Sequence, residues 1–256
     1  MPPKQRGQLS FDFSAVAGPS TSADALATGA SAGVRPRMGC FDLADEEAQV
    51  GRDDRPPDLR FERRLWREGI VRVAGVDEAG IGPLAGPVVA AAVMFAPEPC
   101  IPGVDDSKRL SCSERLRLAD IIRERSLAIA VSVVEVAEID AINIYQAGLL
   151  AMRRAVLALP IAPDYVLTDA RRIPELEAAQ APIIRGDRLC FSIAAASIIA
   201  KTHRDALMDT LDREYPHYGF ARNKGYPTPQ HQAAIRQFGP SPAHRQIGRA
   251  SCRERV

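Results

Sequence analysis

The segment Val71-Arg-Val-Ala-Gly-Val-Asp-Glu-Ala-Gly-Ile-Gly-Pro-Leu-Ala-Gly-Pro-Val-Val-Ala-Ala-Ala-Val-Met94 contains two apolar runs separated by a turn rich in glycine and proline. The runs, residues 71–76 and 88–94, predict two buried strands. An adjacent carboxylate pair, Asp77-Glu78, directly follows the first run. Glycine-rich turns let the backbone approach a ligand and direct N–H groups at anionic oxygens. Carboxylates beside such a turn indicate that a metal cation meets a phosphate there, and the alternative is a strand–turn–strand unit with a solvated acidic turn.

The composition of the whole chain is that of a globular protein. Its 256 residues are 46% hydrophobic and 25% charged, which suffices for one large domain or two small ones. The formal charge of +1 means that any site for a polyanion must be local. The five cysteines form no CxxC pair, which favours reduced thiols in a cytoplasmic protein. No stretch approaches the roughly 18 continuous apolar residues of a membrane span, so no membrane partner is expected, and nothing indicates more than a monomer.

Helices and strands are predicted to alternate after the opening segment. Ser113 is expected to cap a helix in which Leu116, Ile121 and Ile122 face inward. The other predicted elements are a short charged helix at 61–69, strands at 127–136, 165–169 and 181–184, helices at 144–159 and 192–215, and a terminal helix. This order predicts an α/β domain with a mixed sheet.

The long helix at 192–215 places polar side chains on one face. Ser197, Lys201 and Asp205 are four residues apart and therefore lie on the same side of the helix. A single aspartate on a helix is most often a solvated charge, and Asp169 at a strand end is often a cap or turn residue. The residues alone leave open whether these carboxylates converge.

Several motifs together resemble the ribonuclease HII family over residues 72–245. The opening segment is very similar to the family signature, Asp77-Glu78-Ala-Gly-x-Gly-Pro-Leu-Ala-Gly-Pro-Val. The other matching motifs are Asp106-Ser-Lys108, Asn143-Ile144, Ser192-Ile-Ala-Ala-Ala-Ser-Ile-Ile-Ala-Lys201, Arg204-Asp205, and Gly225-Tyr226 with His231. The resemblance implies a ribonuclease H-like fold, in which helices flank a mixed central sheet and a small helical region follows at the C-terminus.

The resemblance also implies a catalytic and metal-binding set, which carried across residue by residue is Asp77, Glu78, Asp169 and Asp205. Two divalent cations, Mg²⁺ or Mn²⁺, held roughly 4 Å apart can activate a water and stabilise the leaving oxygen of a phosphodiester. Carboxylate oxygens are the hard ligands that Mg²⁺ prefers. Because neighbouring side chains of a strand point to opposite faces, either Asp77 or Glu78 is expected past the strand end, or Glu78 contributes its backbone carbonyl.

The implied substrates are RNA–DNA hybrids and duplex DNA with embedded ribonucleotides, cut on the 5′ side of the ribose to leave a 3′-hydroxyl and a 5′-phosphate. Gly80-Ile81-Gly82 occupies the position whose backbone reads the 2′-hydroxyl, the group that distinguishes RNA from DNA. Tyr226 matches the tyrosine that stacks against the sugar. Lys108 and Lys201 are candidate phosphate contacts, and the alternative for both is an ordinary surface lysine.

The chain departs from the family pattern in three places. Ile81 replaces an arginine, which is expected to weaken substrate binding, and Ala170 replaces a glycine. The end of the chain, Gln246-Ile-Gly-Arg-Ala-Ser-Cys-Arg-Glu-Arg-Val256, also differs, and one choice of codons for it reproduces a common sequencing-library adapter. Residues 246–256 are therefore expected to be a non-native tail rather than a basic nucleic-acid-binding tail. Sequencing the source locus across codon 246 tests this, and a genomic reading that contains the adapter string would refute it.

Residues 1–60 are rich in Gly, Ala, Ser, Pro and Asp and predict a disordered extension before a catalytic domain at 61–245. One island in it, Gln8-Leu-Ser-Phe-Asp-Phe13, resembles short peptides that dock on bacterial sliding clamps. Phe11 and Phe13 would be the hydrophobic anchors. The alternative is a chance cluster in a tail.

The sequence therefore predicts a metal-dependent endoribonuclease of the ribonuclease HII type. Two rivals remain, another nuclease of the same fold and a non-catalytic duplex-binding module, the second left open by Ile81.

Overall fold

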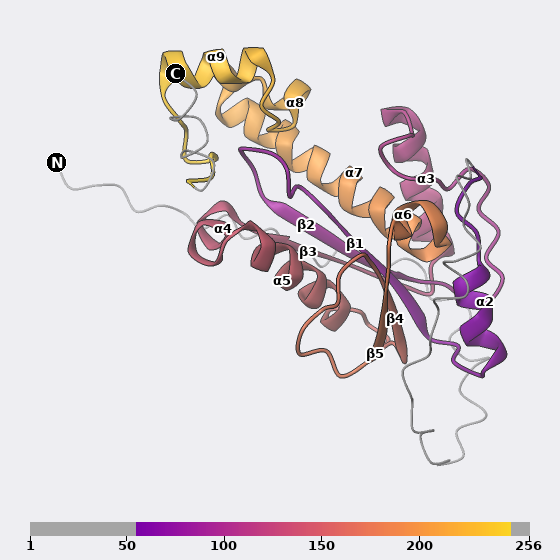
Figure 1. The fold of residues 1–256 in the computed structure, drawn as a ribbon. Helices are drawn as coiled ribbons and strands as arrows, with labels where there is room; N and C mark the ends of the chain where they lie inside the picture. The colour runs from indigo at the N-terminus through magenta and orange to yellow at the C-terminus, as the bar shows by residue number, and fades with distance from the viewer. Residues whose placement is uncertain (1–54, 247–256) are drawn as a thin grey trace. The chain divides into compact units, whose positions relative to one another are not determined.

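A five-stranded mixed sheet is the centre of residues 55–246, the part of the chain that the computed structural model describes (Figure 1). The strands are β1 (Val73–Ala79), β2 (Val88–Met94), β3 (Ala128–Val134), β4 (Tyr165–Asp169) and β5 (Ala179–Ile183). Their order across the sheet is β3-β2-β1-β4-β5. β1, β2 and β3 pair antiparallel, whereas β4 runs parallel to both β1 and β5. This is the mixed sheet of the predicted α/β domain.

Helices cover both faces of the sheet. The helical elements are α2 (Arg60–Arg67), α3 (Cys112–Arg125), α4 (Val136–Ile142), α5 (Ile144–Leu157), α6 (Gly186–Leu189), α7 (Phe191–Glu214), η2 (Pro216–Tyr218), α8 (Phe220–Asn223) and α9 (Pro229–Phe238). α5 packs on one face, against β1, β2 and β3, and α7 packs on the other, against β1, β2 and β4 (Figure 1). η2, α8 and α9 form the small C-terminal helical region.

Alternating side chains of the central strands point into the two apolar layers on either face of the sheet. In β2, Val88, Ala90, Ala92 and Met94 face the layer under α5, whereas Ala91 and Val93 face the layer under α7. All seven residues of β2 are buried, as expected for a strand covered on both faces. Small side chains on β2 and on α7 let the helix lie close to the sheet.

Gly75 is where α7 approaches the sheet most tightly. A Cβ atom at this position would lie 2.2 Å from the backbone carbon of Ser192, at the start of α7. Any other residue would push the helix away from β1. Glycine at position 75 therefore fixes the distance between the helix and the strand that carries Asp77-Glu78.

The predicted elements agree with the structure in type, and several ends differ. β1 extends through Asp77-Glu78 to Ala79, beyond the predicted end at residue 76. The expectation for Ser113 was wrong: Ser111 caps α3 in a reciprocal capping box with Glu114. The helix starts two residues earlier than expected. Of the residues expected to face inward, Ile122 is buried and Ile121 packs against the core, whereas Leu116 is 51% exposed. α4 and α6, both short, were not predicted.

The folded part reaches further towards the N-terminus than residue 61. Asp58 forms a β-bridge with Cys190, and Leu59 is buried. Gln8–Phe13 and residues 247–256 of the predicted tail lie outside the described residues. Within the described part, Cys100, Cys112 and Cys190 are free thiols. No helix between residues 55 and 246 is long and apolar enough to cross a membrane.

Candidate active site

Asp77 and Glu78 both lie within β1 and point to opposite faces of the sheet. Asp77 faces α7, where it accepts a hydrogen bond from the hydroxyl of Ser197. Glu78 faces the other side, where its Oε1 lies 3.6 Å from Nη1 of Arg171. The expectation that one of the two would sit past the strand end was wrong, because the strand continues to Ala79. The alternative, that Glu78 contributes its backbone carbonyl, stays a prediction. The acidic pair thus spans the end of the strand, with one carboxylate on each face.

Asp169 ends β4, the strand next to β1. Its Oδ1 accepts a hydrogen bond from the backbone N–H of Gly186 at 2.8 Å, which ties it to the start of α6. The next residue, Asp187, is buried and adds its negative charge to the surroundings of both Asp169 and Asp77. The structure therefore brings together Asp77, Glu78, Asp169 and Asp187, which we call the acidic cluster.

Asp205 does not belong to the acidic cluster. Its carboxylate pairs with Lys201 Nζ at 2.6 Å and lies 3.6 Å from a guanidinium nitrogen of Arg115 in α3. Ser197, the α7 residue that reaches Asp77, precedes Asp205 by eight residues, roughly 12 Å along a helix. Asp205 is also not among the main charges that act on Asp77, Glu78 or Asp169, so its assignment by resemblance stays a prediction. Lys201, a candidate phosphate contact, has Asp205 as its ion-pair partner in the structure.

Sequence reasoning missed Asp187, although a signal for it existed. β4 and β5 are parallel neighbours, so the residues that follow them meet at the same edge of the sheet. Asp169 ends β4, and Asp187 comes four residues after the end of β5. A search for carboxylates after both strands would have found the pair.

Burial and mutual repulsion raise the pKa of three carboxyls in the acidic cluster. Burial raises the pKa of Asp77 well above its usual range, and the charges of Glu78 and Asp169 add to this. Burial also raises the pKa of Glu78, against the opposing effect of Arg171. The pKa of Asp169 is raised by burial and by the charge of Asp187, against its hydrogen bond from Gly186. The cluster therefore holds more negative charge than its protein surroundings neutralise.

This donor set fits a divalent cation. Oε2 of Glu78 is buried and has no hydrogen-bond partner among the described residues. A buried carboxylate oxygen without a partner is costly, and a hard cation satisfies it. No three histidine, cysteine, aspartate or glutamate side chains within residues 55–246 are arranged so as to hold a metal as they stand. Unneutralised carboxylates repel one another, so side-chain adjustment would accompany cation binding.

Lys108 lies beside the acidic cluster. Its Nζ is 2.9 Å from Oδ2 of Asp187. Burial opposes its charge, but the hydrogen bond to Asp187 and the charges of Asp106 and Asp77 together raise its pKa. The loop that carries it is tied to α7 by a hydrogen bond of 2.9 Å between Ser107 and Ser197. Lys108 is thus a fixed cation whose side chain is 72% exposed.

Two buried arginines hold the loop at residues 80–87, which we call the glycine loop. Arg245 donates to the carbonyl oxygens of Gly80 at 2.6 Å and of Pro83 and Gly86 at 2.8 Å. Arg204 donates to the carbonyl oxygens of Pro87, Ala85 and Lys224. Because these buried arginines bind its carbonyl oxygens, the loop has a defined conformation beside the acidic cluster. These arginines were not singled out from the sequence as loop anchors.

Gly80 and Gly82 have different structural roles in this loop. Gly80 has φ +106°, and a Cβ atom there would lie 2.4 Å from Nε of Arg204, so only glycine fits. A Cβ at Gly82 would lie 3.5 Å from the ring of Tyr226, which places this ring over the loop. Ile81 packs against the apolar layer under α5. Tyr226 is 45% exposed and so has its ring available beside the loop.

A chain of hydrogen bonds fixes the backbone at Tyr226. Its carbonyl oxygen accepts from Nδ1 of His231 at 2.8 Å, and Nε2 of His231 lies 2.9 Å from Nε2 of His244. Since a carbonyl can only accept, His231 carries its proton on Nδ1 and accepts from His244 through Nε2. Burial lowers the pKa of His231, which favours this neutral state.

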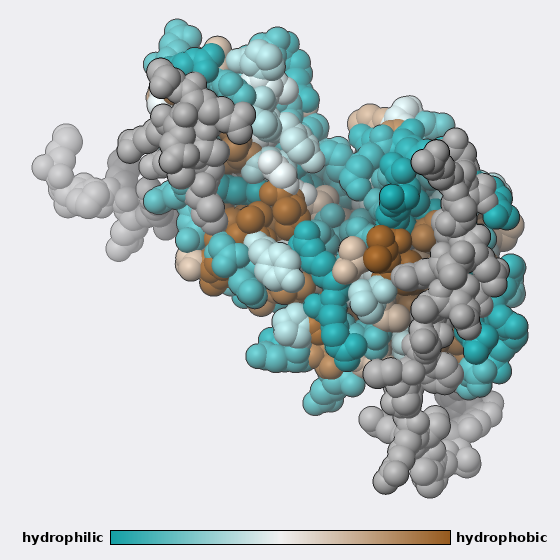
Figure 2. All heavy atoms as spheres, viewed as in Figure 1, coloured by the Kyte–Doolittle hydropathy of each residue, from teal (hydrophilic) through white to brown (hydrophobic). Residues whose placement is uncertain are grey.

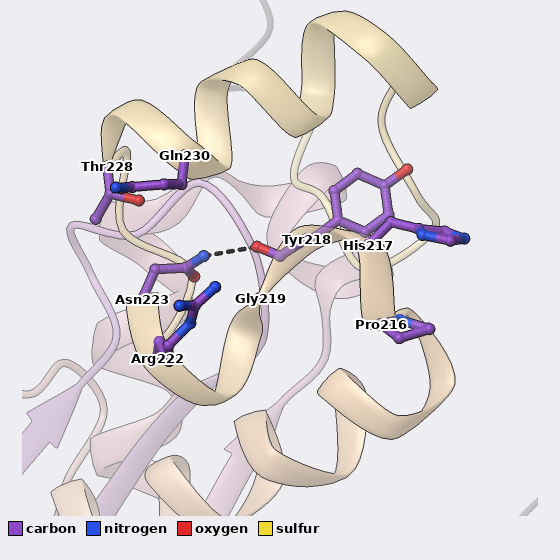
Figure 3. A pocket seen from close by; sticks show the side chains of 8 residues that line it. All are labelled: Pro216, His217, Tyr218, Gly219, Arg222, Asn223, Thr228 and Gln230. Atoms are coloured by element: carbon purple, nitrogen blue, oxygen red, sulfur yellow. Dashed lines mark hydrogen bonds between the residues drawn. The ribbon is translucent and has the colours of Figure 1, made fainter.

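A separate hollow of about 310 Å³ lies in the C-terminal helical region (Figure 3). Figure 3 shows Arg222 and Asn223 on one side of it and Thr228 and Gln230 on the other, with the amide of Asn223 donating to the carbonyl of Tyr218. No carboxylate lines this hollow. In Figure 2, hydrophobic side chains gather over the middle of the visible face, between polar side chains over α8 and α9 and over α3 and α6.

The mixed sheet and the acidic cluster at the ends of its parallel strands define a protein of the ribonuclease H-like fold. The solved ribonuclease H2 of Pyrococcus horikoshii OT3 matches with a TM-score of 0.60 and 27% identity, over 71% of this chain and 95% of that one. A ribonuclease HII of Archaeoglobus fulgidus, solved in complex with PCNA, shares the fold with a TM-score of 0.58 and 24% identity, over 72% of this chain and 97% of that one.

Sequence comparison gives the family. Residues 74–254 match the family model described as Ribonuclease HII. Ribonuclease HII proteins of Anaeromyxobacter sp. (strain Fw109-5) and Myxococcus xanthus (strain DK1622) are each 55% identical over 73% of this chain. The chain spans 59% and 64% of the length of these two relatives, and 90% of a relative from Moorella thermoacetica (strain ATCC 39073 / JCM 9320) that is 52% identical over 72% of this chain. The chain belongs to the ribonuclease HII family.

Proposed function

We propose that the chain is an endoribonuclease that hydrolyses the RNA strand of RNA–DNA hybrids and cuts duplex DNA on the 5′ side of embedded ribonucleotides. The acidic cluster beside the glycine loop is the observation that supports this most. It gathers four carboxylates, one of them with an unpartnered buried oxygen, next to backbone and side-chain groups able to bind a polyanion.

Asp77, Glu78, Asp169 and Asp187 would hold divalent cations, Mg²⁺ or Mn²⁺. Two such cations supply an activated water and a stabilised leaving oxygen, which gives a 3′-hydroxyl and a 5′-phosphate. The protein's own part is to fix the carboxylates. β1 and α7 hold Asp77, whereas Gly186 orients Asp169 through its N–H group. Lys108, held by Asp187, is poised to contact a phosphate at the edge of the cluster.

The glycine loop and Tyr226 would read the ribose. Arg204 and Arg245 bind carbonyl oxygens of the loop. The N–H groups of Leu84 and Gly86 also have acceptors within the protein, so the N–H groups proposed to face a ligand are those of residues 80–82. The 2′-hydroxyl is the group by which a protein distinguishes RNA from DNA at one position. The Tyr226 ring over Gly82 is placed to stack on the sugar that follows.

Three duplexes of the same sequence test the proposal: an RNA–DNA hybrid, a DNA duplex with one ribonucleotide, and all-DNA. We expect Mg²⁺- or Mn²⁺-dependent cleavage of the first two and none of the third. Cleavage of all-DNA would indicate another nuclease of this fold. Binding without cleavage of any duplex would indicate a non-catalytic module.

A sliding clamp is proposed as a protein partner through Gln8–Phe13, and a monomer as the working state. Both proposals rest on the sequence.

A further inference from the structure

Arg171 lies at the rim of the acidic cluster, two residues after β4 ends. Ala170 turns the chain with φ +54°, and the backbone N–H of Arg171 donates to the carbonyl of Asp169 at 2.6 Å. The guanidinium then lies between two groups. Its Nη1 is 3.6 Å from Oε1 of Glu78, and its central carbon is 5.3 Å from the ring centre of Tyr145 on α5.

One donor of this guanidinium is left unused. Nη1 is buried, and no hydrogen-bond partner for it exists among residues 55–246. The separation of 3.6 Å from Glu78 is too long for a hydrogen bond, so the pair attracts by charge alone. A buried donor without a partner costs free energy, which a bound ligand would recover. Oε2 of Glu78 is also buried without a partner, so the two orphaned atoms belong to the same part of the site.

The unused donor faces the same small space as the glycine loop. A Cβ atom on Gly148 of α5 would lie 2.9 Å from Cδ1 of Ile81 and 3.3 Å from Nη1 of Arg171. A side chain at position 148 would require Ile81 to shift, so both side chains lie against this glycine. Arg171 is therefore adjacent both to the acidic cluster, through Glu78, and to the loop proposed to read the ribose, through Ile81.

Lys108 and Arg171 differ in how closely they are paired with carboxylates of the protein. Lys108 makes a close ion pair of 2.9 Å with Asp187. Arg171 has a long ion pair and lies over the ring of Tyr145, a residue that is 51% exposed. A guanidinium offers parallel N–H groups that match two oxygens of a phosphate, and an aromatic ring beneath it leaves those groups free.

We propose that Arg171 binds a backbone phosphate of the nucleic-acid strand beside the glycine loop, an inference that rests on the proposed function. The phosphate oxygens take up the orphaned Nη1 donor. Arg171 thus supplies, from the end of β4, a positive charge that Ile81 cannot supply from the loop. The competing role for Arg171 is purely internal, as a counter-charge for Glu78.

Binding measurements on the full chain separate these roles. The ligand is a DNA duplex with one ribonucleotide, and the background is Asp77→Asn, so that binding is measured without cleavage. Arg171→Ala is expected to weaken binding by about tenfold to a hundredfold, the factor that a hydrogen bond to a charged group is worth. The slope of log K against log salt should also become shallower by about 0.9, the value for one lost phosphate contact. Arg171→Lys should keep most of the slope.

Arg172→Ala is the matched control, because Arg172 is the next residue, carries the same charge and is exposed. It should bind within about twofold of the parent, as expected for a charge that makes no phosphate contact. An unchanged salt slope in Arg171→Ala, equal to that of Arg172→Ala, would overturn the proposal and leave Arg171 as a counter-charge for Glu78.

A neutral methylphosphonate, placed at one backbone position at a time, locates the contact. At one position near the ribonucleotide the parent protein should lose affinity, whereas Arg171→Ala should lose none. Adding Ile81→Arg to Arg171→Ala should restore binding, because both side chains reach the space above Gly148. The absence of any such position, or of rescue, would contradict the proposal. Cleavage by the protein with Asp77 intact is measured in parallel, so that failure of the proposed function is seen separately.

Discussion

The carboxylates of the acidic cluster should differ from Asp205 in their effect on turnover. Asp77→Asn, Asp169→Asn and Asp187→Asn each keep the shape of the side chain and remove a charge needed to hold cations. We expect each to lower the cleavage rate by about two orders of magnitude or more, with losses that do not add, because the groups act as a unit. Asp205→Asn removes a partner of Lys201 and Arg115, outside the cluster.

Asp205→Asn should therefore keep a much larger share of activity than Asp187→Asn. Single-turnover cleavage of a ribonucleotide-containing duplex, with circular dichroism as a check of folding, measures both. A larger loss for Asp205→Asn than for Asp187→Asn would return Asp205 to the site.

The raised pKa of Asp77 predicts a stability that depends on pH in a defined direction. A carboxyl whose pKa is raised on folding lowers the stability of the folded protein when it is charged. This loss of stability is complete above the folded pKa and absent below the unfolded pKa, which is ordinarily about 3.9. Without metal, Asp77→Asn should therefore raise the melting temperature at about pH 8. Its advantage should shrink as the pH falls towards about 4.

Thermal melts in EDTA across this pH range check the sign, and Mg²⁺ or Mn²⁺ should then stabilise the parent more than the variant. A variant that is less stable than the parent at neutral pH would show that Asp77 is favourably charged without metal.

At the level of single residues, strand patterns placed Asp77, Glu78 and Asp169 at the ends of apolar runs. That these carboxylates belong to one site was implied by the family resemblance, because the pattern of a single sequence does not show which strand ends meet. The surroundings of Asp205 could not be predicted, because helical spacing shows which side chains share a face but not how far along the helix the strand ends lie. The orphaned Nη1 of Arg171 depends on Gly148 and Ile81, and no local pattern predicts such a meeting.

Among the elements, α7 is capped from a distant part of the chain. The side chain of its N-cap residue, Cys190, does not cap it, and Glu62 of α2 instead accepts from the N–H of Ser192 at 2.8 Å and from its hydroxyl at 2.7 Å. Removing this acceptor leaves a buried N–H group unsatisfied, so Glu62→Ala should lower the free energy of unfolding by about 1–3 kcal/mol.

Glu62→Gln keeps an acceptor oxygen and removes the buried charge, so it should cost less than Glu62→Ala. Urea denaturation at neutral pH compares the two. Equal losses would mean that packing, and not the cap, is what Glu62 contributes.

The conformation of the glycine loop should be lost when Arg245 is changed. Arg245→Ala leaves the carbonyls of Gly80, Pro83 and Gly86 without their donor, and each buried unsatisfied group costs about 1–3 kcal/mol. Arg245→Lys should recover little, because an ammonium cannot reach several carbonyls in a fixed fork.

Arg236→Ala, an exposed position on α9, serves as the control in urea denaturation and in cleavage assays. If Arg245→Ala unfolds at the same urea concentration as Arg236→Ala, the hydrogen bonds to the loop do not stabilise the protein.

The types of the elements could be predicted because their apolar spacing is strong, as in β2 and α7. Their ends could not, since local hydrogen bonding chooses among nearby caps, as Ser111 does over Ser113. The anchoring of the glycine loop by Arg204 and Arg245 joins segments far apart in the sequence, so single-sequence patterns do not contain it.

For the molecule as a whole, the segment Gln8–Phe13 remains a prediction with a direct test. Deleting residues 1–54 should leave cleavage of short duplexes unchanged and abolish binding to a sliding clamp. The deletion stops before Asp58, because Asp58 and Leu59 belong to the folded part. Full-length protein with Phe11→Ala and Phe13→Ala is the matched control in a clamp pull-down. Clamp binding that survives both changes would rule the segment out.

The anchoring of the glycine loop also has a consequence for the order of events during synthesis. The bond from Arg245 to Gly80 spans 165 residues. A ribosome adds about 5–20 residues per second, so Gly80 is made on the order of ten seconds before its anchor. All five strands and α7 precede Arg245 in the chain and can assemble first. A nascent chain should thus acquire its sheet before it acquires the ability to cut nucleic acid, and chains released early should be folded but inactive.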